Sequence, residues 1–163
     1  MVSSTTSVEK ITVEHVTIRS SNTFAAVKTK LEALVPRLDD GYVTLLRFGL
    51  VDQARQALEA AATLSIFANR NHGALLAIAG LNRQAIQYDI GNPLTASLMT
   101  RHNVSAGLYA PIRVLLRESS EGEVAFEYDR PLSTFGQFAD EKIDVVARKL
   151  DENLENVLLK AAN

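Results

Sequence analysis

One apolar stripe near the C-terminal end of the chain constrains the fold more than any other feature. Its members recur at steps of 4, 3, 4, 3 and 4 positions with charged residues between them: Ile143, Ala147, Leu150, Leu154, Val157 and Ala161. Steps of three and four match the turn of an α-helix, so the segment predicts a long amphipathic helix. A helix with one apolar face needs a surface to cover, and a β-sheet in the same chain would supply it.

The remainder of the chain mixes strand and helix patterns. Alternating or β-branched runs predict strands at residues 11–19, 42–48, 64–68, 74–79, 85–90, 112–117 and 123–128. The first strand changes phase near His15, which predicts a bulge there. The run at 74–79 is apolar at every position, which is typical of a central strand buried on both faces. Helices are expected at residues 24–34, 52–62 and 93–101, and residues 132–138 are expected to be irregular or a short helical turn.

This order of elements favours an α+β fold. Strands outnumber the helices between them in the second half, which favours a mostly antiparallel, curved sheet with helices packed on one face. The long C-terminal amphipathic helix would be one of them. The 163 residues fit a single domain, expected over residues 10–163 behind a small, polar and flexible N-terminal segment at residues 1–9.

Charge and composition exclude several classes of function. The net charge is −2, from 17 basic and 19 acidic residues, so a nucleic-acid partner is not expected. No stretch approaches the ~20 apolar residues of a membrane span, so no membrane partner is expected either. The chain has no cysteine and no apolar run behind a basic start, which fits a cytoplasmic protein.

Metal and cofactor motifs are absent from the sequence. Without cysteine there are no thiolate ligands, and the three histidines, His15, His72 and His102, have no partner at helical spacing. Glycine-rich phosphate and dinucleotide motifs are also missing. We therefore expect no metal site and no cofactor.

Several sequence words, in fixed order, resemble one known family. They are NHGALL at 71–76, YDIGNPLTA at 88–96, GLYAPIRV at 107–114, EYDRP at 127–131, FGQF at 135–138 and VARKLD at 146–151. Together they resemble the domain-of-unknown-function 302 family. The resemblance implies one β-α-β sandwich related to the TATA-binding-protein-like fold, and a protein that is often a homodimer. A shared fold carries no DNA-binding function with it.

Polar residues within these words form the candidate binding site. His, Arg, Asp and Tyr side chains together can bind and polarise a small oxygenated molecule. The candidates are His72, Asn92, Tyr109, Arg113, Tyr128, Asp129 and Gln137.

A structural role is an alternative for most of these residues. Asn92 precedes Pro93 and is typical of a helix cap. His72 precedes Gly73 and can satisfy backbone groups in a turn. Tyr128 can be a core residue, and Gln137 can bond the loop backbone.

Arg113 is the candidate least easily explained by structure alone. A cation in mid-strand beside apolar residues needs a carboxylate partner, which Asp89 or Asp129 would supply as a structural ion pair. The alternative is that Arg113 stays available to a ligand.

Three functions remain open. The favoured one is an uncharacterised small-molecule-binding protein with an apolar pocket between sheet and helices. The second is a cofactor-free isomerase or lyase, with His72 or Asp129 as base, a tyrosine as acid and Arg113 on a developing oxyanion. The third is a homodimeric structural protein that associates through apolar stripes and the edge of the 112–128 hairpin.

Overall fold

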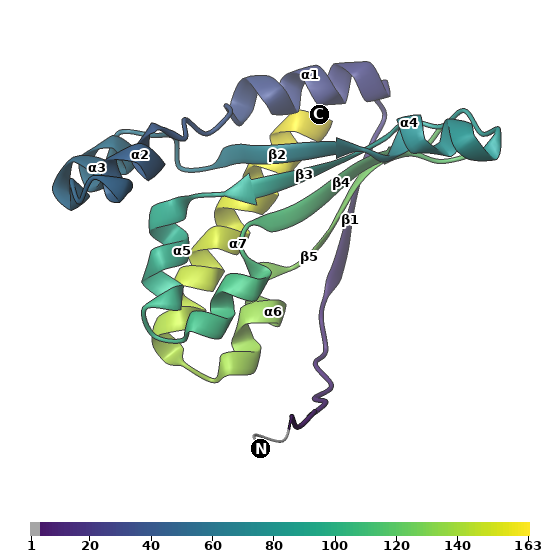
Figure 1. Cartoon of the computed structure of the whole chain (residues 1–163). Helices are drawn as coiled ribbons and strands as arrows, with labels where there is room; N and C mark the ends of the chain where they lie inside the picture. Colours follow the sequence, from purple (N-terminus) through teal and green to yellow (C-terminus); the bar gives the residue numbers. More distant parts are fainter. Residues whose placement is uncertain (1–3) are drawn as a thin grey trace.

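A single five-stranded sheet organises the molecule, which we describe from a computed structural model covering residues 4–163 (Figure 1). All neighbouring strands are antiparallel, in the order β1-β5-β4-β3-β2. The strands are β1 (His15–Ser20), β2 (Ser65–Asn71), β3 (Ala85–Gly91), β4 (Ile112–Glu118) and β5 (Val124–Asp129).

Helices pack on one face of this sheet, with α7 lying across it and α1 beside α7 (Figure 1). The α-helices are α1 (Phe24–Leu34), α2 (Gly41–Arg47), α3 (Val51–Glu59), α4 (His72–Leu76), α5 (Pro93–Thr100), α6 (Pro131–Phe135) and α7 (Glu141–Ala162). Short 3₁₀ turns follow at Ala77–Ala79, Val104–Tyr109 and Gly136–Phe138. The expected α+β architecture with one helical layer is confirmed.

Strand alternation supplies the core between sheet and helices. Ile112, Val114 and Leu116 of β4 point to the helices and are buried, while Arg113 points the other way and is exposed. The stripe of α7 meets this face: Ile143, Ala147, Leu150, Leu154 and Ala161 are buried, as predicted, and Val157 is half-buried. The second face of the sheet carries no helix among the described residues, and we call it the open face.

Helix α7 is long because both its pattern and its start favour it. The carboxylate of Asp140 accepts hydrogen bonds from the backbone N–H groups of Lys142 and Ile143, which would otherwise lack partners. Apolar burial along 22 residues then stabilises the helix against the sheet.

The β4–β5 hairpin lies in the middle of the sheet. Its strands are flanked by β3 on one side and by β1 on the other. The expectation that the hairpin offers a free edge is therefore wrong, and the edges of the sheet are β1 and β2. The apolar stripe of α7 is likewise covered by the sheet of the same chain. Neither the stripe nor the hairpin edge therefore supports a homodimer, which stays a prediction.

Residues 42–48 are not a strand, contrary to expectation, but form α2 and its cap. Tyr42, Val43 and Thr44 have strand propensity, but the segment packs against α3 as a helical hairpin. Gly49 joins the two helices with φ of 74°, in the left-handed region that glycine adopts at little cost.

Residues 74–79 are also helical, contrary to the expected central strand. Asn71 caps α4 by accepting a hydrogen bond of 2.9 Å from the backbone N–H of Ala74. Ala and Leu are strong helix formers, and a short apolar run does not distinguish a helix from a buried strand. The segment is not buried: Leu75 is 60% and Ile78 is 89% exposed.

Strand β1 begins at His15 rather than at residue 11, and its register with β5 runs without a bulge. The partner strand β5 ends at Asp129, opposite His15, because Pro131 lacks an N–H group and starts α6. Residues 4–14 therefore have no helix or strand. The bulge in this sheet lies instead in β2, between Ile66 and Ala68.

Among residues 4–163, no helix combines the length and the apolar character that crossing a membrane requires.

Candidate functional site

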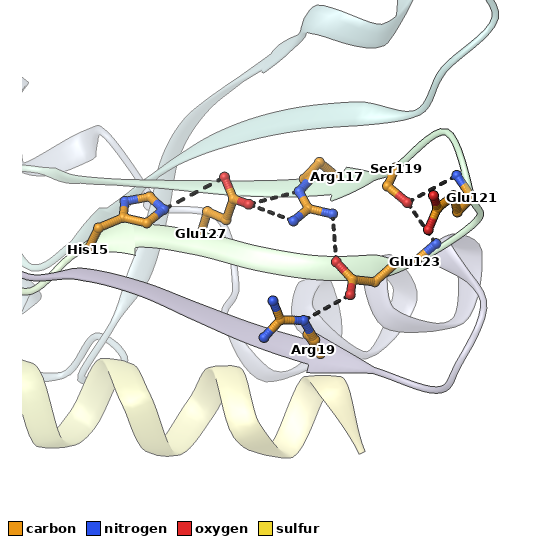
Figure 2. Close-up of polar contacts among 7 residues, drawn as sticks. All are labelled: His15, Arg19, Arg117, Ser119, Glu121, Glu123 and Glu127. Carbon is orange, nitrogen blue, oxygen red and sulfur yellow. Dashed lines mark hydrogen bonds and ion pairs between the residues drawn. The ribbon is translucent and has the colours of Figure 1, made fainter.

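The open face of the sheet carries a network of ion pairs. Arg117 lies between Glu127 and Glu123, at 2.7 Å and 3.1 Å, and Arg19 approaches Glu123 to 2.8 Å (Figure 2). Hydrogen bonds from Arg19 and Arg117 lower the pKa of the Glu123 carboxyl below its ordinary value. Each of these four side chains therefore has a partner of opposite charge.

Arg113 differs from its neighbours because it has no ion-pair partner within 4.0 Å among the described residues. Asp89 lies opposite Arg113 in the register of β3 and β4, but its carboxylate pairs with Arg70 at 2.8 Å. The register of β4 and β5 continues to Asp129 on the other side, but Asp129 meets His15 at 3.2 Å. The structural ion pair considered for Arg113 is therefore not formed.

His72 lies at the start of α4, where its side chain reaches over β3. Its Nε2 atom is 3.0 Å from Oε1 of Gln87, so its partner is a side chain and not the turn backbone. Both residues line a hollow of about 470 Å³ on the open face, which we call the His72 hollow. Its other lining residues are His15, Ala85, Arg113, Leu115, Glu127, Tyr128 and Asp129.

Tyr128 borders the His72 hollow, but its side chain points to the opposite face from Arg113 and Asp129. It is buried on the helix-covered face, one residue from the exposed Asp129. Its hydroxyl has no hydrogen-bond partner among the described residues, and burial raises the pKa of Tyr128 to about 12. Burial also raises the pKa of Asp151 nearby on α7, whose carboxylate accepts a 3.2 Å hydrogen bond from the backbone N–H of Leu132.

Tyr109 and Gln137 lie together at the end of the sheet. The Tyr109 hydroxyl donates to Oε1 of Gln137 at 3.4 Å, and Gln137 donates to the backbone carbonyl of Thr134. The Tyr109 ring stands edge-on to Phe135 and Phe138, with centroids 6.2 Å and 6.1 Å away.

This ring forms one wall of a second hollow of about 220 Å³, the Tyr109 hollow. Arg113 and Asp129 line it as well, so the two hollows meet at this pair of residues. Its remaining lining residues are mostly apolar: Ile11, Val13, Leu108, Pro111, Ile112 and Thr134.

Asn92 is a helix cap, as the structural alternative predicted. Its Oδ1 atom accepts hydrogen bonds from the backbone N–H groups of Leu94 and Thr95, and its Nδ2 atom donates to the carbonyl of Ala62. Pro93 follows at the first helical position, where a missing N–H costs nothing.

Asn92 also lines a cavity of about 280 Å³ between the end of the sheet and α5, which we call the apolar cavity. Its polar lining residues come from α5 or its cap, namely Asn92, Thr95, Ser97 and Thr100. The other walls are Phe67, Ile90, Gly91, Pro93, Ala96, Met99, Ala110, Pro111, Ile112 and Leu150.

The structure thus divides the predicted site. His72, Arg113 and Asp129 meet on the open face, Tyr109 and Gln137 lie beside them at the end of the sheet, and Asn92 and Tyr128 lie elsewhere. Sequence reasoning missed His15 and Glu127 as members of the open face. Strand alternation was the available signal, because Glu127 lies two positions before Asp129 on β5 and therefore shares its face.

Within residues 4–163, no three or more acidic or histidine side chains gather as a metal site would require.

Comparison with known proteins gives a family and a fold. The family model described as "Domain of unknown function DUF302" matches residues 48–161. A crystal structure of an uncharacterised conserved DUF302 protein from Bacillus stearothermophilus is similar, with a TM-score of 0.66 and 14% identity. The similarity covers 90% of this chain and 97% of that chain. No curated protein matches the sequence.

Proposed function

The chain belongs to the DUF302 family of domains of unknown function, and this membership assigns no activity. We propose that the protein binds a small, mainly apolar molecule in the apolar cavity. The observation that carries the proposal is the cavity itself. Several of its walls belong to the buried core between sheet and helices, namely Ile90, Met99, Ile112 and Leu150. Beside α5 about 280 Å³ remains open.

The lining of the cavity indicates the size and chemistry of the ligand. Ligand pockets usually span ~300–1,000 Å³, so this one, at the lower end, suits a small molecule of one ring or two fused rings. The hydroxyls of Ser97 and Thr100 donate to the carbonyls of Leu94 and Ala96, which leaves their oxygens available as acceptors. We therefore expect a ligand with an apolar body and a single hydrogen-bond donor.

Ala96 offers a direct test, because it is half-buried on α5 and lines the cavity. Indole is a suitable probe: it has one aromatic body and one N–H donor. Binding at 100 times the dissociation constant would add about 2.7 kcal/mol to the free energy of unfolding and raise the melting temperature. We expect this shift in the native chain and its loss in Ala96→Phe, whose ring would fill the space.

Leu98→Phe is the matched control, since Leu98 lies on the same helix, is 39% exposed and does not line the cavity. It should keep the full indole shift. Ala96→Leu provides a smaller filling should the phenylalanine variant fold poorly. A shift with indole in both Ala96 variants as large as in the native chain, or no shift in the native chain with either indole or the monocyclic phenol, would contradict the proposal.

The other two functions have weaker support. His72, Arg113 and Asp129 line one hollow, as an acid–base enzyme would need. The side chain of Tyr128 faces the helices, so Tyr109 in the adjacent hollow is the tyrosine that such an enzyme would use as the acid. The enzyme, the homodimer and the cytoplasmic location stay predictions.

A further inference from the structure

We propose a second site on the open face, in which Arg113 binds the carboxylate of a small monocarboxylic acid with an apolar or aromatic body. Arg113 lies on the central strand of the sheet at the junction of the Tyr109 and His72 hollows. An unpartnered guanidinium at such a junction can meet a carboxylate with two parallel hydrogen bonds.

The neighbouring strands explain why Arg113 has no ion-pair partner among the described residues. Asp89 and Asp129 flank it across the sheet, and either would pair with it if unoccupied. Arg70 holds the first at 2.8 Å, and His15 lies 3.2 Å from the second. Among the described residues, the Arg113 guanidinium is therefore left without a carboxylate within 4.0 Å.

The charges around the two hollows favour a ligand with a single negative charge. Arg113 is the only Lys or Arg among the described residues that line the two hollows, so a second negative charge on the ligand would face Asp129 and Glu127 unopposed. The site therefore favours a carboxylate over a phosphate monoester dianion.

The walls of the two hollows place the rest of the ligand. Beyond Arg113, the Tyr109 hollow offers Leu108, Pro111 and the fixed ring of Tyr109 to an apolar body. On the other side, His72 and Gln87 offer polar atoms to any hydroxyl or carbonyl that the acid carries. Acid head and apolar body are thus accommodated by adjacent surfaces.

The experiment is an NMR titration of the isotope-labelled chain with phenylacetate, the neutral 2-phenylethanol and the dianionic phenyl phosphate. We expect phenylacetate to bind most tightly and to shift resonances around Arg113 and Tyr109. Arg113→Gln should weaken phenylacetate binding at least about tenfold, because the variant loses the charge-assisted hydrogen bonds to the carboxylate. Arg113→Lys keeps the charge but loses the planar guanidinium, so its affinity for phenylacetate should lie between those of the native chain and Arg113→Gln.

Arg19→Gln is the matched control, because Arg19 is on the same face, pairs with Glu123 and lines neither hollow. It should bind phenylacetate as the native chain does. Ala96→Phe separates this site from the apolar cavity and should leave phenylacetate binding unchanged. Equal affinity for acid and alcohol, tighter binding of the phosphate, unchanged binding in Arg113→Gln, or no binding at millimolar phenylacetate would each overturn the inference.

Discussion

At the scale of single residues, Asp151 is the side chain whose burial has the clearest thermodynamic consequence. It is 7% exposed, and its pKa is raised by burial. A raised pKa means that folding favours the protonated form. The protonated carboxyl therefore contributes stability below the unfolded pKa of 3.8, and this contribution is lost as the pH rises through the folded value.

Asp151→Asn should remove this pH dependence. The amide oxygen can still accept the hydrogen bond from the Leu132 N–H, but it carries no charge to desolvate. Urea unfolding at pH 4 and pH 7 should show that the variant gains stability, relative to the native chain, at the higher pH. Glu152→Gln, at an exposed neighbouring position, is the control. An equal effect of Asp151→Asn at both pH values would contradict the assignment.

Gly73 is a residue at which close backbone contacts leave no room for a side chain. An added Cβ atom would lie 2.4 Å from the carbonyl oxygen of Arg83 and 2.9 Å from the backbone nitrogen of Ala85. Gly73→Ala should therefore lower the free energy of unfolding by about 1–3 kcal/mol, the usual cost of forced displacement. Gly107→Ala would meet only Thr100 Cγ2 at 3.7 Å and should change stability little. Denaturant unfolding of both variants checks the pair, and equal effects would refute the steric argument.

Part of the candidate site was predictable at this scale, and part was not. Alternation along β5 already separates Tyr128 from Asp129, since adjacent strand residues face opposite sides. Whether Arg113 is paired depends on Arg70 and His15, which reach its flanking carboxylates from strands distant in sequence. No local pattern contains that information.

At the scale of elements, the start of α5 joins a structural role to the apolar cavity. Asn92 caps the helix through Oδ1 and bonds Ala62 through Nδ2. Asn92→Ala should cost about 0.5–2 kcal/mol of stability for the lost cap. Asn92→Asp keeps the acceptor and should recover most of that loss in thermal unfolding. If both variants were equally destabilised, the bond to Ala62 rather than the cap would be the main contribution.

The accuracy of sequence prediction also varies by element, for physical reasons. The stripe of α7 and the alternation of β3 and β4 identify elements that bury one face, and the structure contains all three. The strand predictions for residues 42–48 and 74–79 are wrong because neither segment lies in the sheet. Leu75 and Ile78 remain exposed, so burial did not select a strand there. The Asn71 cap selected the helix instead.

At the scale of the whole molecule, two arms extend from the sheet: the α2–α3 hairpin at one end of β2 and α4 at the other (Figure 1). Both expose apolar residues, with Phe48 at 77% and Ile78 at 89%. Segments with little burial open at low free-energy cost. Hydrogen exchange should therefore be fast at residues 41–49 and 72–84 and slowest in β4 and β5. Protection of the arms equal to that of β4 would indicate that something covers them, which a mass measurement in solution would then identify.

The pairing of β1 with β5 has a consequence for how the chain is made. His15 and Asp129 meet although 114 positions separate them. At a synthesis rate of roughly 5–20 residues per second, the first strand waits on the order of ten seconds before its partner leaves the ribosome. Asn22, just after β1, also bonds the carbonyls of Ala162 and Asn163 at the other end of the chain. Nascent chains stalled before residue 124 should therefore leave the β1 segment open to chaperones and proteases.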